Sequence, residues 1–205
     1  MPMEANALFG IFGAFGLSAS AGLNAYIPLL VIGVIAHYTD WIKLSPPFDL
    51  IANAWILILI SVLLIVEMLA DKIPAVNHIN DILQTIVRPA AGAIVFAASA
   101  HVITHVHPLL ALACGLLVAG SIHVVKSAAV RPAVTATTAG AGNIPVSVGE
   151  DVLATVLSIL SVVIPVLVAV ILIVLAAFLI WWLWRRANRI RRADPSSTGA
   201  DSGST

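Results

Sequence analysis

The sequence predicts an all-α, polytopic membrane bundle of about five spans, with one or two hydrophobic runs broken or re-entrant. Three observations predict this class. The composition is 60% hydrophobic and only 10% charged, whereas soluble domains carry about a quarter charged residues. Several apolar runs approach or exceed the roughly 20 residues that a helix needs to cross a bilayer. Small residues and prolines interrupt these runs, as in packed membrane helices. We therefore expect residues 1–186 to form one membrane domain.

The charge balance narrows the classes of partner. Ten basic and ten acidic residues cancel, so no overall field favours binding to nucleic acid, and we expect none. The partners that the composition indicates are the lipid bilayer, a small ion, solute or lipid headgroup, and further copies of the chain. The first residues lack the basic segment of a cleavable signal peptide, so we expect the first apolar run to be retained in the membrane.

The first run, residues 8–36, is long for one span and has an unusual middle. That middle reads Ser18-Ala-Ser-Ala-Gly-Leu-Asn24-Ala-Tyr-Ile-Pro28. Small residues allow neighbouring helices to approach closely. Asn24 and Pro28 weaken the backbone hydrogen-bond ladder. The run is either one tilted, Pro-kinked helix or a broken helix whose backbone groups line a cavity, as in many transporters.

The second and third spans are expected to be separated by a polar turn. The second covers residues 51–70, and Pro74 prevents its simple continuation. Asp81 is expected to cap a short interfacial helix that ends at Val87. Arg88 and Pro89 then open the third span, because proline suits the first helical turn.

The second half of the chain contains two more apolar runs. Pro108 begins a fourth span to about residue 126, and residues 127–151 are expected to form a partly buried, non-helical loop. The last run, residues 152–184, is too long for one upright span, and Pro165 is expected to kink or divide it. Residues 187–205 form a basic, then Ser/Gly-rich, disordered tail that the positive-inside rule makes cytoplasmic.

A five-span topology brings the ends of spans two and four and the starts of spans three and five to one membrane face. The predicted ion- or solute-binding residues converge there: Glu67, Asp71, Lys72, Arg88, Lys126, Arg131, Glu150 and Asp151, with Asn24 and Asn143 from the two Gly/Asn/Pro-rich segments. A cytoplasmic tail places this face outside, which the positive-inside rule disfavours. Two explanations remain. Carboxylates inside the protein could neutralise the bases of the site, or residues 152–184 do not cross the membrane once, so that the site and the tail are both cytoplasmic.

Three interpretations of this charged site remain open at the level of sequence. Glu67 or Asp71 could bind a cation or carry a proton, since ionisable groups within a membrane usually mark function. Arg88, Lys126 and Arg131 could instead receive an anion or a lipid phosphate. The ion pairs could also merely hold the helices in register.

Other site classes find little support. His101, His105 and His107 have a spacing that can hold a divalent metal, but no nearby cysteine or carboxylate completes a ligand set, and interfacial histidines are preferred. The sequence lacks the nucleophile elbow, the zinc helix and the phosphate-binding loop of common enzymes. We therefore expect no metal and no cofactor. A channel or transporter is the leading interpretation, and a membrane enzyme or lipid-handling protein that binds a phosphate headgroup stays an alternative.

A family resemblance adds to this interpretation. The segment from Ser18 to Pro28, Glu67-x-x-Ala-Asp71-Lys72-Ile-Pro74, Asp81, Arg88-Pro89-Ala-Ala-Gly92, Lys126, Arg131-Pro132 and Glu150-Asp151 resemble, as an ordered set, a bacterial membrane family designated domain of unknown function 4126. The resemblance covers roughly residues 8–180. It implies a small, polytopic protein of the bacterial inner membrane and supplies no activity.

Overall fold

The computed structural model describes the backbone of residues 2–71, 74–103, 107–138 and 141–193. Side chains are described for residues 10–71, 80, 82–99, 107–138, 141–165, 167, 170, 171 and 173–186. Within these ranges the regular elements are helices, which confirms the predicted all-α class. Lys72, His105 and the tail from residue 194 lie outside the described residues, as do the side chains of Asp81 and His101.

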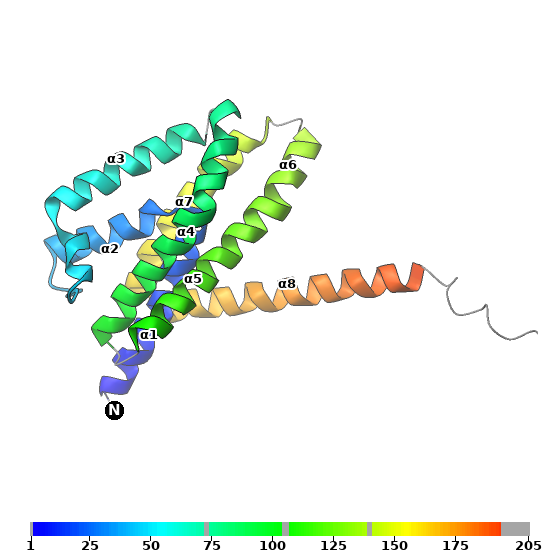
Figure 1. Ribbon diagram of the computed structural model, residues 1–205. Helices are drawn as coiled ribbons and strands as arrows, with labels where there is room; N and C mark the ends of the chain where they lie inside the picture. Colours follow the sequence, from blue (N-terminus) through cyan, green and yellow to red (C-terminus); the bar gives the residue numbers. More distant parts are fainter. Residues whose placement is uncertain (1, 72–73, 104–106, 139–140, 194–205) are drawn as a thin grey trace, which may run out of the picture. The chain divides into compact units, whose positions relative to one another are not determined.

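The elements follow one another along the chain with short connections (Figure 1). They are α1 (Pro2–Leu23), α2 (Tyr26–Tyr38), η1 (Phe48–Ala52), α3 (Ala54–Ala70), α4 (Pro74–Ile103), α5 (Pro108–Val125), η2 (Lys126–Val130), α6 (Arg131–Thr138), α7 (Asn143–Val163) and α8 (Pro165–Ala193). Among the described residues, three helical stretches are long and apolar enough to cross a membrane: Ile82–Ser99, Pro108–Thr138 and Asn143–Val163. Three shorter helices, Gly10–Leu23, Tyr26–Tyr38 and Ala54–Ala70, are also apolar.

The chain divides into two compact units, Met1–Ala169 and Val170–Thr205. The described part of the second unit is the end of α8. There the guanidinium of Arg185 lies 5.2 Å from the ring of Trp181, and that of Arg186 lies 5.4 Å from the ring of Trp182. Such cation–π contacts suit a helix end at a membrane surface. The candidate site lies wholly within the first unit.

Helix α1 is the centre of the first unit and packs against α4, α5 and α7. Small residues make this packing close: a side chain added at Gly22 would lie 2.6 Å from the Ala119 carbonyl oxygen. Ser18 Oγ donates to the carbonyl oxygens of Gly92 and Gly115, at 3.2 and 2.8 Å. Helices that lack bulky side chains at their contacts gain van der Waals packing and interhelical hydrogen bonds.

The first apolar run is broken, so its interpretation as one kinked helix is wrong. α1 ends at Leu23 and α2 begins at Tyr26. Asn24 Oδ1 accepts hydrogen bonds from the backbone N–H groups of Tyr26 and Ile27, at 3.0 and 3.2 Å. Asn24 therefore satisfies the first donors of α2. Pro28 causes no break, because it lies in the first turn of α2, where its missing N–H is no loss.

The predicted division before Arg88 is also wrong, because α4 runs without interruption from Pro74 to Ile103 and contains Pro89. One buried stripe extends along this helix through Asn80, Gln84, Arg88, Ala91 and Val95. The spacing of these residues matches the helical repeat. Tertiary packing of the stripe thus outweighs the hydrogen bond that the proline removes.

The predicted loop over residues 127–151 is wrong for most of its length. The helix that begins at Pro108 continues through η2 and α6 to Thr138, and α7 begins at Asn143. The hydroxyls of Thr137 and Thr138 bond to carbonyls of the preceding turn, so these threonines are compatible with a helix. The last apolar run is divided, as expected, where α7 ends at Val163 and α8 starts at Pro165.

Candidate functional site

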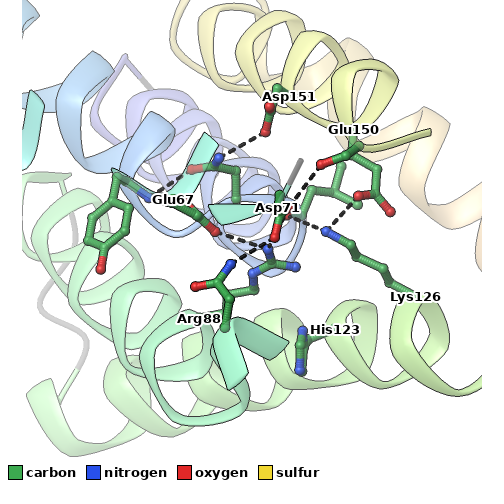
Figure 2. A network of polar contacts seen from close by, with 12 residues as sticks. Glu67, Asp71, Arg88, His123, Lys126, Glu150 and Asp151 are labelled. Atoms are coloured by element: carbon green, nitrogen blue, oxygen red, sulfur yellow. Dashed lines mark hydrogen bonds and ion pairs between the residues drawn. The ribbon is translucent and has the colours of Figure 1, made fainter. Parts of the chain in front are cut away.

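A buried ion pair joins the end of α3 to the middle of α4. Glu67 lies in the last turn of α3 and is 2% exposed, while Arg88 is 0% exposed. Arg88 Nη2 donates to Glu67 Oε1 at 2.9 Å and lies 4.0 Å from Asp71 Oδ2 (Figure 2). Because Glu67 and Asp71 are four residues apart at a helix end, one guanidinium nitrogen faces both carboxylates.

Asp71 accepts hydrogen bonds from side chains of three helices, α4, α6 and α7. Asn80 Nδ2 of α4 donates to Oδ1 at 2.7 Å. Oδ2 accepts from Ser147 Oγ of α7 at 2.9 Å and from Arg131 Nη2 of α6 at 3.2 Å. Asp71 lies just past α3; burial raises its pKa, but the charges of Arg131 and Lys126 and the bond from Ser147 hold it below its usual value overall. Asp71 is therefore ionised at neutral pH.

The π-helical turn η2 presents two cations to one carboxylate of α7. Lys126 Nζ lies 2.6 Å from Glu150 Oε2, and Arg131 Nη2 lies 3.9 Å from the same oxygen. The backbone N–H of Arg131 bonds to the carbonyl of Lys126, five residues earlier. This wider turn brings two side chains five positions apart to the same face of the helix, and such turns occur frequently at functional sites.

The break between α1 and α2 is part of the same network. Lys126 Nζ donates to the carbonyl oxygen of Leu23, the last residue of α1, at 3.1 Å. Asn24 Nδ2 donates to Asp151 Oδ1 at 2.9 Å. Lys126 thus bonds a backbone carbonyl that the break leaves without a helical partner, and the break is tied to both η2 and α7.

The structure therefore brings together the described charged residues of the predicted site with Asn24: Glu67, Asp71, Arg88, Lys126, Arg131, Glu150 and Asp151. Lys72 lies outside the described residues. Asn143 bonds instead with Thr135, at 3.2 and 3.1 Å.

Sequence reasoning missed Asn80 and Ser147, which both bond to Asp71. A signal for each was present in the spacing. Ser147 precedes Asp151 by four residues, and Asn80 precedes Arg88 by eight, so each shares a helical face with a charged residue.

Hydrogen-bonding capacity remains unused at the pair of Glu67 and Arg88. Within the described part of the chain, Glu67 Oε2 and Arg88 Nε and Nη1 are buried and have no hydrogen-bond partner. The pair is therefore joined through one nitrogen and one oxygen, whereas arginine and a carboxylate can form two parallel bonds. Buried polar groups left without a partner cost free energy.

An apolar groove reaches the network from one side. Its volume is about 440 Å³, and it lies among α2, α3 and α7. Aliphatic side chains form most of its wall, and Asp151 is the charged residue among its lining residues. The carboxylate that receives the Asn24 hydrogen bond therefore also borders this groove.

Comparisons with known proteins place the chain in a family. No curated protein and no solved structure matches it significantly. A family model described as domain of unknown function (DUF4126) matches residues 11–186. This match includes every residue of the charged network and the break between α1 and α2. The chain belongs to the family of domain of unknown function 4126.

Proposed function

We propose that this protein is a multi-pass protein of the bacterial inner membrane that conducts or transports a small ion or solute. The charged network is its site. The observation that carries the proposal is the position of the network at a helix break: Lys126 bonds to the last carbonyl of α1, and Asn24 caps α2. Transporters commonly build their ion sites at such discontinuous helices, where backbone groups and side chains meet.

Burial supports a functional network over a solvated charged face. Glu67, Arg88 and Lys126 are each less than a twentieth exposed. Ionisable groups at such positions in a membrane protein are costly and mark ion or proton pathways by default. Glu67 and Arg88 also keep buried atoms without hydrogen-bond partners, and such a pair stabilises the fold less than apolar side chains would.

A lipid-phosphate site at the three bases receives less support from the geometry. Arg88 lies 2.9 Å from Glu67, Lys126 lies 2.6 Å from Glu150, and Arg131 lies 3.2 Å from Asp71. Each base therefore already has a carboxylate partner, and a phosphate would have to displace it. Carboxylates that neutralise the bases also weaken them as topology signals.

The test is flux through the purified full-length protein in liposomes. Glu67→Gln and Asp71→Asn each remove one charge of the network, and we expect both to abolish flux while the protein still inserts and folds. Asp40→Asn is the matched control, because the Asp40 side chain is 99% exposed. A panel of alkali cations, chloride and protons identifies the conducted ion.

Two outcomes would contradict the proposal. Unchanged flux in both variants across the panel would remove the network from the transport path. Charge reversal of the pair, Glu67→Arg with Arg88→Glu, distinguishes a transport site from an ion pair that only holds the helices in register. Full recovery of stability and flux by the double variant would indicate that the ion pair only holds the helices in register.

A further inference from the structure

We infer that the ion handled at this site is a proton, and that the carboxylate of Glu67 binds and releases it. This inference rests on the proposed transport function and names its substrate and carrier. It starts from the uneven bonding of the four carboxylates in the network.

Three of these carboxylates are held by nearby donors or cations. Asp71 accepts bonds at both oxygens. Glu150 Oε2 also lacks a hydrogen-bond partner among the described residues, but it lies 2.6 Å from Lys126 Nζ and 3.9 Å from Arg131 Nη2. Asp151 accepts a bond from Asn24. Such partners stabilise the ionised form.

Glu67 differs from these three. Its Oε1 atom accepts from Arg88, but its buried Oε2 atom has no donor among the residues that the structure describes. An ionised oxygen in this position is poorly compensated. Proton binding is therefore more favourable at Glu67 than at the other three carboxylates.

Burial favours a proton over a larger cation. Glu67 is 2% exposed and Arg88 is 0% exposed. A metal cation needs several oxygen ligands and room for them. A proton needs only one oxygen, on which it forms a single O–H bond, and Glu67 Oε2 has that capacity unused.

Proton binding has a structural consequence through Arg88. When the proton forms an O–H bond with Oε2, Glu67 becomes neutral, and Arg88 keeps its own charge. Arg88 Nη2, already 4.0 Å from Asp71 Oδ2, is then attracted mainly to Asp71. On release the O–H bond breaks, the proton leaves to water, and Arg88 again pairs with Glu67 Oε1. Arg88 thus exchanges between two carboxylates at the end of α3.

The charged and titratable groups around Glu67 allow such exchange. Arg88 from α4 and Lys126 from η2 favour its ionised form, whereas Asp71, just past α3, opposes it. Tyr26 from α2 also interacts electrostatically with Glu67. Lys126 is itself paired with Glu150, at 2.6 Å, and Arg88 also faces Asp71, at 4.0 Å, so neither cation acts on Glu67 alone.

The first experiment measures proton flux into liposomes that contain a pH-sensitive dye, driven by a potassium diffusion potential. We expect proton influx with the wild type, influx at the level of empty liposomes with Glu67→Gln, and wild-type influx with Asp40→Asn. Equal influx with Glu67→Gln and wild type would overturn the inference. Wild-type flux of an alkali cation or chloride without protons would also overturn it and leave transport standing. Absence of flux for every ion of the panel would overturn the transport proposal itself.

The second experiment detects the proton on Glu67 without transport. In infrared difference spectra of the purified protein, we expect a carbonyl band of a buried carboxylic acid that grows as pH falls from mildly alkaline to mildly acidic. This band should be missing from Glu67→Gln and from Glu67→Gln with Arg88→Gln, in which no buried charge of the pair is left alone. A band of wild-type size in either folded variant would overturn the assignment to Glu67.

Discussion

Replacement of Arg88 by methionine tests how the buried pair contributes to stability. Arg88 is 0% exposed and lies 2.9 Å from Glu67 and 4.0 Å from Asp71. Arg88→Met leaves Glu67 buried without its partner. Breaking a buried pair in this way costs about 3–5 kcal/mol. We expect Glu67→Gln alone to cost less, because the charge of Arg88 then lies 4.0 Å from Asp71 Oδ2 and can pair with that carboxylate.

The double variant Glu67→Gln with Arg88→Met should behave differently. Arg88 Nε and Nη1 and Glu67 Oε2 have no hydrogen-bond partner among the described residues, so the wild-type pair recovers only part of its desolvation cost. Replacing both charges should therefore leave the free energy of unfolding within about 1 kcal/mol of the wild type.

Reversible unfolding of the purified protein in mixed micelles, at increasing fractions of denaturing detergent, measures these free energies. The double-mutant cycle then gives the coupling between the two side chains. Additive losses in the double variant would refute the reasoning, because they would show that Glu67 and Arg88 stabilise the fold independently of each other.

Two further predictions concern the packing and the helix break. Gly22→Ala places a side chain 2.6 Å from the Ala119 carbonyl oxygen, and we expect it to lower the free energy of unfolding by about 1–3 kcal/mol in the same assay. Gly149→Ala is its control: nothing lies within 4 Å, and the helix should gain about 0.5–1 kcal/mol. Asn24→Ala removes the cap of α2 and should cost about 1–2 kcal/mol. Asn24→Asp keeps the cap but sets two carboxylates together at Asp151, so thermal unfolding should show a greater loss. Equal stability of the two Asn24 variants would contradict a role for the bond to Asp151.

Composition and spacing were sufficient for the class of the fold and for the described charged residues of the network, but not for Asn80 and Ser147. The share of apolar residues predicts membrane helices because lipid solvates apolar side chains and a helix bonds its own backbone polar groups. Glu67, Asp71, Arg88 and Lys126 were identified because charges beside long apolar runs are costly unless they meet. Their functional role stays a prediction.

Helix boundaries were decided by packing. Pro89 was expected to begin a helix, but the buried stripe through Arg88 and Val95 continues α4 across it. Residues 127–138 were expected to form a loop, but the π-turn at Lys126 directs Lys126 and Arg131 to Glu150 and keeps the chain helical. Local propensity is worth tenths of a kcal/mol for most residues and about 3 kcal/mol for a proline inside a helix, and the tertiary contacts of the buried residues outweigh both.

The sequence by itself determined that this is an α-helical chain of membrane-like composition with charges gathered near the ends of its apolar runs. Only the tertiary structure decided that the first run breaks at Asn24 and that Lys126 bonds to the broken end. It also showed that Arg88 reaches Glu67 through a single bond. The physical reason is that periodicity fixes which side chains share a face, whereas hydrogen-bond partners depend on where separate helices meet.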